Sequence, residues 1–488
     1  MKIKNLFFTA LATMALASCS DNEEIVNGGL DNPVVEKGDA YISFAMKMPT
    51  SIARANGAPN AGSEVESKVT TALALLFDGD QATSKLVTKK TLVWTGETAT
   101  FAGKASDAFK VDSTATKILV VANPTTEIIN RAEEGATLST VKEAFSVGDI
   151  SSLTTKDQFT MSNYKLVDCK TFIVKGTLGE TEDAVKNKAK DHPVVVPVDR
   201  LVAKVTLEAN ANLNDNANVT IEEWALNVTN QKFLLLPDTC TATELKDGHA
   251  DSFEYFLYTK DANFENKAAW TLGDYQKEFK VDNGYTAYGA DTKNLYCAEN
   301  TMQATDQLYN YTTQALLKVS FIPAKDTKGA AITDSWFRFE GKAYTADNIA
   351  AAFTAATDDS TLKTAGKAFA DSLGKGEDFV AALEAVDETT SAKVATTGIE
   401  YFHKGYSYYK VMIRHNQLND KLMTLGRYGV VRNNWYTLTV TSISEPGLSY
   451  PETPEQIFKN KTEDDVLNYL SVQISVKPWT TWNQNIEL

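Results

Sequence analysis

The chain has 488 residues, 43% of them hydrophobic, and a net charge of −15 from 48 basic and 63 acidic residues. This length predicts two or three domains with hydrophobic cores, and an acidic chain without a basic cluster argues against a nucleic-acid partner. The cysteines show no C-x-x-C spacing, so we expect no disulfide framework. They are Cys19, Cys169, Cys240 and Cys297.

The N-terminus has the parts of a secretory signal. Lys2 and Lys4 precede an apolar run, residues 5–17, that is too short to span a bilayer. The sequence LASC, ending at Cys19, resembles the lipobox of bacterial lipoproteins, in which the cysteine is lipidated and becomes the mature N-terminus. The alternative, a short buried helix with an ordinary cysteine, fits the basic start and the acidic SDNEE sequence less well. The resemblance implies a signal peptide over residues 1–18 and a palmitate-carrying lipoprotein of the outer membrane.

The next segments predict a tether, a strand and a loop. Residues 20–39 are polar and aperiodic, as in a tether. The sequence YISFAMKM, residues 41–48, alternates as a half-buried strand does. Its apolar face consists of Ile42, Phe44, Met46 and Met48. Residues 49–64 are rich in Pro, Gly, Ala, Asn and Ser, which predicts an exposed loop, and contain one basic residue, Arg54.

The remainder is dominated by strand patterns. Short β-branched and aromatic runs without regular intervening helices predict a mainly β protein built from β-sandwiches. The clearest runs are residues 72–77, 117–123, 193–198, 201–209, 225–230, 315–322, 408–415, 434–443 and 469–476. Residues 346–386 are Ala-rich with helical spacing, and we interpret them as a helical insertion that packs rather than binds a ligand.

The sequence contains no recognised catalytic pattern. The G-x-S-x-G, H-E-x-x-H and P-loop motifs are absent. None of the four histidines pairs with another at metal-ligand spacing, and no pattern supports a glycosidase carboxylate pair. We therefore expect a protein that is not an enzyme and that binds no cofactor or metal.

Several pieces, taken together and in order, resemble the fimbrillins of Bacteroidales, the FimA-type pilins, and the major subunit of short fimbriae in particular. The pieces are LVVANP (119–124), FTMSN (159–163), VPVDRLVAKVTL (196–207), YCAEN (296–300), TQALLKVSF (313–321), YYKVMIRH (408–415), YGVVRNNWYTLTVTSISEPG (428–447) and QISVKPWTTW (473–482). They extend over nearly the whole chain after Cys19.

The resemblance implies a domain plan. It implies two transthyretin-like β-sandwich domains, with the helical insertion in the second. The expected limits are a propeptide of tether and first strand, an N-terminal domain, a C-terminal domain and a C-terminal donor strand, at residues 19–54, 55–240, 241–488 and 469–482.

The resemblance also implies assembly into surface fimbriae by strand exchange after a proteolytic cut. Fimbrillins are matured by an arginine-specific protease, and the loop places that cut between Arg54 and Ala55. The cut would remove the first strand. The C-terminal segment repeats its period of two and ends near Trp479, so we expect it to be the donor strand. The donor side chains are Leu470, Val472, Ile474 and Val476.

The alternation leaves another interpretation open, because any half-buried strand in its own domain alternates in this way.

The expected function is a structural subunit of fimbriae in adhesion and biofilm formation. Its partners are other copies, accessory fimbrial subunits, the protease and unidentified host or bacterial receptors. The membrane is contacted through the Cys19 lipid only before processing. The alternatives are an accessory or tip subunit, or a surface glycan-binding lipoprotein.

Overall fold

The computed structural model describes most of the chain after the tether. The described residues are 39–47, 60–93, 105–156, 158–241, 243–245, 258–265, 270–281, 284–416, 423–463 and 470–480. Cys19, Met48, Arg54, Ala55 and Trp482 lie outside these ranges. Within them, no helix is long and apolar enough to cross a membrane.

The expectation of a mainly β protein is confirmed. A six-stranded antiparallel sheet forms the centre of the first half, in the order β15-β11-β7-β4-β5 with β12 beside β7. Strands β4 and β7 are buried along nearly their whole length, which explains why both are continuous apolar runs. The six strands are β4 (Thr71–Phe77), β5 (Leu86–Val93), β7 (Lys117–Ala122), β11 (Met161–Ser162), β12 (Val167–Asp168) and β15 (Asp199–Arg200).

Shorter strands and three helices surround this sheet. The two strands nearest the N-terminus, β1 and β2, belong to two small sheets with β6, β13 and β14. Their bounds are β1 (Ala40–Ile42), β2 (Phe44–Lys47), β6 (Phe109–Lys110), β13 (Val174–Lys175) and β14 (Val194–Pro197). The helices are α1 (Thr126–Arg131), α2 (Leu138–Lys142) and α3 (Glu182–Asp191).

Two larger sheets face each other in the second half. One has the order β24-β16-β30-β31-β3 and the other β23-β17-β25-β29. Their inward side chains form one core, and β25 and β30 alternate between buried and half-buried residues as sandwich strands do. The strands are β3 (Asn60–Ala61), β16 (Val202–Ala209), β17 (Ala217–Asn227), β23 (Thr286–Ala287), β24 (Asn294–Ala298), β25 (Gln314–Pro323), β29 (Tyr406–Met412), β30 (Asn434–Ile443) and β31 (Leu470–Thr480).

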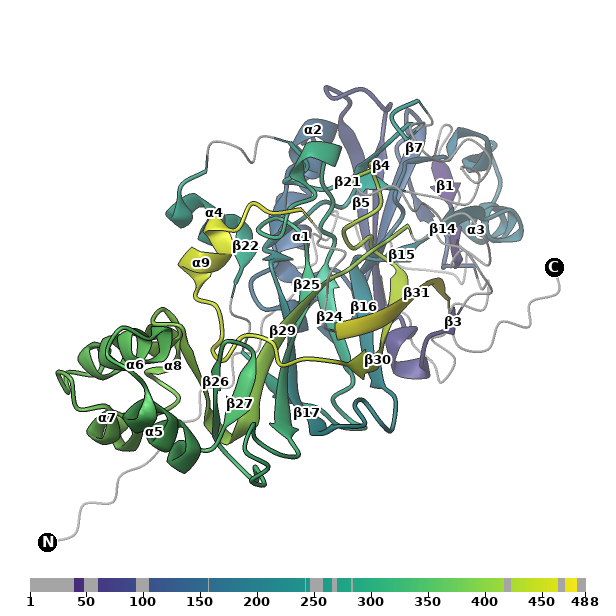
Figure 1. Ribbon diagram of the computed structural model, residues 1–488. Coiled ribbons are helices and arrows are strands. Elements are labelled where there is room, and N and C mark those ends of the chain that lie inside the picture. The colour runs from purple at the N-terminus through teal and green to yellow at the C-terminus, as the bar shows by residue number, and fades with distance from the viewer. Residues whose placement is uncertain are drawn as a thin grey trace, which may run out of the picture.

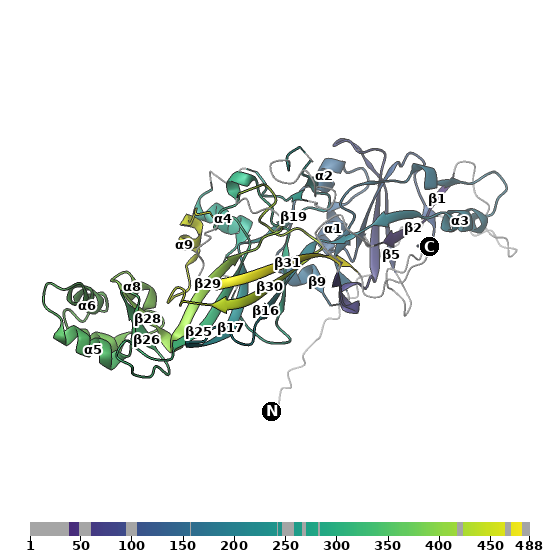
Figure 2. The same cartoon turned by 45° about the vertical axis from the view of Figure 1, so that its right-hand side comes forward.

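A helical part projects from the end of these sheets (Figures 1 and 2). Four helices lie with a three-stranded sheet of order β27-β26-β28 and share a core of their own. At Gly366 an added Cβ would lie 2.3 Å from Phe353 Cε2, so this helix position needs glycine. The elements are α5 (Ala346–Ala355), α6 (Thr361–Ser372), α7 (Phe379–Ala385), α8 (Ser391–Ala395), β26 (Trp336–Phe339), β27 (Lys342–Tyr344) and β28 (Ile399–Phe402).

Short elements complete the fold. The strands are β8 (Phe145–Ser146), β9 (Thr154–Thr155), β10 (Gln158–Phe159), β18 (Thr229–Asn230), β19 (Lys232–Phe233), β20 (Asp238–Thr239), β21 (Thr259–Lys260) and β22 (Phe279–Lys280). The α-helices are α4 (Leu272–Glu278) and α9 (Pro454–Lys459). The 3-10 turns are η1 (Glu64–Glu66), η2 (Ile150–Ser152), η3 (Lys170–Phe172), η6 (Ala304–Asp306) and η7 (His403–Gly405).

The chain passes from the first main core to the second within β16. Val202 packs in the first core and Ala203 in the second, while Phe233 and Leu235 return to the first. The predicted domain limit at residue 240 lies beyond both β16 and β17. The domain limits therefore stay a prediction. Figure 2 shows the helical part, the two larger sheets and the first-core strands following one another along the molecule.

Candidate functional site

The N-terminal strands are enclosed by neighbours on both sides. Strand β1 lies between β13 and β6, pairing antiparallel with each. Strand β2 pairs in parallel with β14, and Ala45 forms an antiparallel bridge to Ala105 on its other side. Strand β1 is therefore the central strand of its sheet, whereas β2 has β14 on one side and, on the other, the bridge to Ala105 and the backbone hydrogen bond from Ser106 N to Phe44 O.

Both faces of this segment are buried, whereas the sequence predicts burial of one face. Ile42 and Phe44 are 0% exposed and Met46 is 5% exposed, and all three pack in the first core. On the other face, Tyr41 packs against Val185 of helix α3. The second face is buried because α3 and a small sheet cover it, and a pattern of alternation does not reveal such a cover.

A buried serine fixes the segment between β1 and β2. Ser43 is 0% exposed, and its hydroxyl donates to the carbonyl oxygen of Ser106 at 2.8 Å. Phe44 N donates to Ser106 Oγ at 3.1 Å, and Ser106 N donates to Phe44 O at 2.8 Å. Removal of residues 40–47 would leave these polar groups and the backbone of the neighbouring strands without partners.

The apolar side chains of residues 40–47 contribute a large part of the free energy that holds this segment in the first core. Burial of Ile42, Phe44 and Met46 contributes roughly 5–9 kcal/mol at about 1.5–3 kcal/mol for each side chain. A site vacated by residues 40–47 can thus bind a strand that supplies a similar apolar face.

The C-terminal strand lies in the second core. Residues 470–478 of β31 pair antiparallel with β30, with Leu470 opposite Ile443 and Ile474 opposite Leu438. Leu470 is buried, and Val472 and Ile474 are half-buried against the second core. Ser471, Gln473 and Ser475 alternate with them and are exposed. The backbone of Val476 and Trp479 is paired, and their side chains lie outside the described part of the structure.

The predicted site residues are therefore not brought together within one copy of the chain. The first-strand residues lie in the first core and the donor residues in the second, in different sheets. Arg54 and Ala55 belong to residues 48–59, which connect β2 to β3 and are outside the described residues, as is Cys19.

Sequence reasoning did not find strand β3 or the charged cluster that follows it. Asn60 and Ala61 pair in parallel with Trp479 and Thr480, at the end of β31. Glu66, just beyond, forms an ion pair with Lys204 at 2.8 Å, and both side chains are about 95% buried or more. The sequence from Ser63 to Glu66 has the spacing of a capping box, which the structure contains. The capping-box spacing could have indicated the turn at Ser63–Glu66 from the sequence. A strand of two residues is too short to show a pattern in the sequence.

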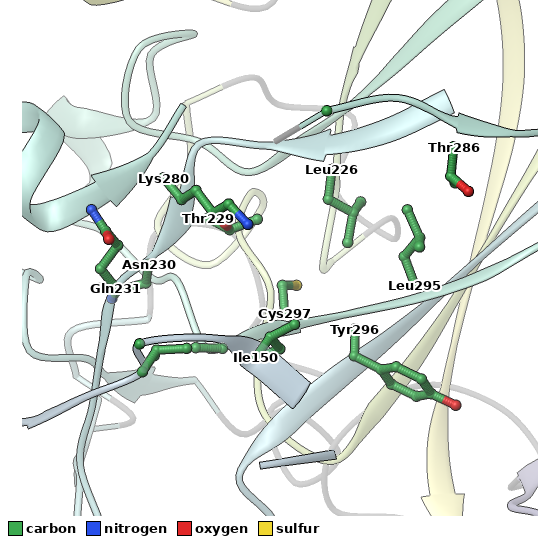
Figure 3. A pocket seen from close by; sticks show the side chains of 14 residues that line it. Ile150, Leu226, Thr229, Asn230, Gln231, Lys280, Thr286, Leu295, Tyr296 and Cys297 are labelled. Atoms are coloured by element: carbon green, nitrogen blue, oxygen red, sulfur yellow. The ribbon is translucent and has the colours of Figure 1, made fainter. Parts of the chain in front are cut away.

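A cavity of about 260 Å³ lies where the two halves of the molecule meet (Figure 3). Val147 and Ile150 line it from the first half, and Leu226 and Leu295 from the second. Cys297 also lines it, and burial raises the pKa of this thiol to about 12, so it stays protonated and unreactive near neutral pH. Across the described ranges, no three His, Cys, Asp or Glu side chains are grouped so as to bind a metal ion.

Comparison with known proteins bears on the C-terminal region. Residues 400–485 match the family model described as major fimbrial subunit protein type IV, fimbrillin, C-terminal. The match extends from β28 to the end of β31 and confirms, for this region, the resemblance to fimbrillins. Proteins described in this way are structural subunits, which supports the expectation that the chain is not an enzyme. No curated protein matches the sequence.

Two solved structures illustrate the likeness of shape. The fimbrilin FimA from Porphyromonas gingivalis W83 has 16% identity and a TM-score of 0.43, with 91% of this chain and 98% of that chain covered. The tip fimbrial protein Mfa3 from Porphyromonas gingivalis, with a C-terminal truncation, has 12% identity and a TM-score of 0.35, with 90% and 100% covered. Neither TM-score reaches 0.5, so these similarities carry no functional argument.

Proposed function

We propose that this chain is a structural subunit of surface fimbriae that polymerises by strand exchange. In this proposal the precursor is held in the outer membrane by a lipid on Cys19. An arginine-specific protease cuts between Arg54 and Ala55, the segment containing residues 40–47 leaves, and the C-terminal strand of another copy takes its place. The resulting extracellular fimbria serves adhesion and biofilm formation, together with accessory subunits and receptors on host or bacterial surfaces.

The observation that carries the proposal is the position of residues 40–47. This segment is flanked by β13, β6 and β14 and is buried on both faces. Its removal would open a groove with apolar walls and unpaired backbone on both sides. Such a groove has a strong affinity for an extended strand.

The register of the donor matches the groove at its apolar positions and at Ser43. With Leu470 in the position of Ile42, Val472 falls on Phe44 and Ile474 on Met46. Ser471 then falls on Ser43, whose hydroxyl donates to the Ser106 carbonyl oxygen. A serine at that position can make the same hydrogen bond, so the match extends from the apolar side chains to the buried polar one.

The fimbrillin match over residues 400–485 supports the same conclusion, because it includes the whole proposed donor strand. The donor and the groove lie in different cores of one copy. Exchange between copies therefore joins different surfaces, the head-to-tail kind of contact from which an open chain of subunits can grow.

The test is N-terminal sequencing of the assembled form, with Arg54→Ala as the variant. We expect wild-type fimbriae to begin at Ala55. Arg54→Ala should accumulate as an intact precursor without fimbriae in electron micrographs, since the groove stays occupied. Lys68→Ala, the next basic position along the chain, is the matched control and should assemble normally. Fimbriae whose subunits retain residues 40–47 would overturn the proposal.

A further inference from the structure

We infer that Tyr469 of the incoming copy fixes the register of the donor strand by occupying the buried position of Tyr41 beside Glu182. This inference rests on the proposed function and names the residue that decides which donor register the groove accepts. In the proposed register Leu470 takes the position of Ile42, so the residue before it, Tyr469, falls on Tyr41. Further upstream the two sequences no longer correspond, which makes this tyrosine the first matching residue of the donor.

The side chain of Tyr41 is enclosed on the second face of the segment. It is 3% exposed and packs against Val185 and Ala189 of helix α3. Ala108 and Val174 belong to the same cluster. Figure 2 shows α3 and β1 together, at the end of the molecule opposite the helical part. A smaller side chain at this position would leave a cavity, because protein interiors are closely packed.

The Tyr41 site also contains an acceptor for the phenol hydroxyl. The Tyr41 hydroxyl donates a hydrogen bond to the Glu182 carboxylate. Lys186, one turn further along α3, forms an ion pair with the same carboxylate, with 2.6 Å between Nζ and Oε1. Burial and the negative charge of Glu182 raise the pKa of Tyr41 to about 12, so the hydroxyl keeps its proton and is a donor at neutral pH. The site thus recognises a tyrosine by both its ring and its hydroxyl.

Two polar residues of the donor match the second face of the segment. Tyr469 and Ser471 correspond to Tyr41 and Ser43, whereas the apolar residues that define the register lie on the other face. Only 19 of the 488 residues are tyrosines, so agreement at a position that the apolar match does not use is informative. After the cut, the vacated site would present Glu182 and an apolar surface, and a tyrosine satisfies both.

Apolar side chains alone do not fix the register of the donor. A donor displaced by two residues keeps its apolar face toward the first core, because side chains alternate with a period of two. The residues that would then replace Ile42, Phe44 and Met46 are Val472, Ile474 and Val476. This displaced register puts Ser471 into the Tyr41 site, where it is too short to fill the space. Tyr469 therefore selects between two registers that are alike in their apolar contacts.

The first test makes the same substitution in each of the two tyrosines of the full-length chain. Tyr469→Phe should raise the critical concentration for assembly of the cut protein about tenfold, since a hydrogen bond to a charged group is lost. Tyr41→Phe is the matched control: it should lower the unfolding temperature of the uncut precursor but leave the critical concentration unchanged, because residue 41 leaves the subunit in the proposed mechanism. Thermal unfolding of every uncut chain is measured alongside.

A second comparison asks whether the effect depends on Glu182. Glu182→Ala should also raise the critical concentration, and Tyr469→Phe should then add little, because the two residues share one contact. Asp183→Ala is the control, since Asp183 is an exposed acidic residue in the same first turn of α3, and it should assemble like the wild type. A purely structural role of Glu182 would leave the effect of Tyr469→Phe undiminished and would contradict the inference.

Pairs of cysteine substitutions report the register directly. Ser43 Oγ and Ser106 Oγ are 3.3 Å apart, so in the proposed register positions 471 and 106 of adjoining copies are close enough for a disulfide. After oxidation, Ser471→Cys with Ser106→Cys should give a ladder of crosslinked subunits on a denaturing gel. Tyr469→Ser should permit the displaced register, in which Gln473→Cys with Ser106→Cys crosslinks instead.

An unchanged critical concentration for Tyr469→Phe, in fimbriae that begin at Ala55, would overturn the inference and leave the proposed function standing. A ladder from Gln473→Cys with Ser106→Cys in chains that keep Tyr469 would do the same. Cut wild-type protein that forms no fimbriae would count against the proposed function, and against the inference with it.

Discussion

At the scale of single residues, Gln473 is the position where the donor fits the groove least well. In the proposed register it takes the place of Ala45, which is 4% exposed, whereas in β31 its side chain is exposed. Burial of a glutamine amide without full hydrogen bonding costs about 1–3 kcal/mol. Gln473→Ala should therefore strengthen assembly about tenfold or more and leave the monomer as stable as the wild type.

The measurement is the critical concentration for assembly of the cut protein, with thermal unfolding of the monomer alongside. Ser475→Ala is the control, because in this register it falls on the half-buried Lys47 at the end of the segment. We expect it to change little. Weaker assembly of Gln473→Ala would show that the register is displaced from the one proposed.

At the scale of elements, β2 should stabilise the precursor and contribute nothing to the assembled fimbria. Phe44 is 0% exposed and lies edge-on to Phe109, with ring centroids 6.4 Å apart. Phe44→Ala should lower the free energy of unfolding of the precursor by about 3–5 kcal/mol. Fimbriae from the same variant should dissociate at the wild-type temperature, since residues 40–47 leave the subunit in the proposed mechanism.

Phe109→Ala is the matched control for this prediction, because Phe109 remains in the subunit after the cut and should weaken precursor and fimbria alike. Thermal unfolding of each precursor and thermal dissociation of each fimbria are compared. A fimbria weakened by Phe44→Ala would mean that the first strand persists in the polymer. Phe44→Leu gives a milder version if the alanine variant does not fold.

The elements also show what the sequence can reveal and where it fails. Alternation predicts one strand over residues 41–48 and one over 469–476, since period-two burial is a local property. The second is found as β31, whereas the first is divided at Ser43 into β1 and β2, which belong to different sheets. Alternation does not predict that Tyr41 and Ser43 are buried as well, because the covering helix α3 is more than a hundred residues away in sequence. The pairing of β31 with β30 is likewise a property of the tertiary fold.

At the scale of the whole molecule, the separation of groove and donor dictates how assembly can be stopped. In the proposed mechanism, a copy with a usable groove but no usable donor accepts one neighbour and offers nothing to the next, so it ends the growing chain. Ile474→Asp makes such a copy: its carboxylate would be buried without a partner at the position of Met46, which is 5% exposed. Mixed with nine parts of cut wild-type protein, it should reduce fimbriae to a mean length of about ten subunits.

Fimbria length is measured by electron microscopy across a series of mixing ratios. Ile474 is half-buried against the second core in the monomer, so circular dichroism must first show that the variant is folded. Ser475→Asp, on the exposed face of β31, is the control and should leave length unchanged at every ratio. A closed dimer would instead give one size of particle whatever the ratio. If fimbria length did not change with the fraction of Ile474→Asp, β31 would be excluded as the donor. A variant copy can end the growing chain only if every copy must contribute this strand to the next one.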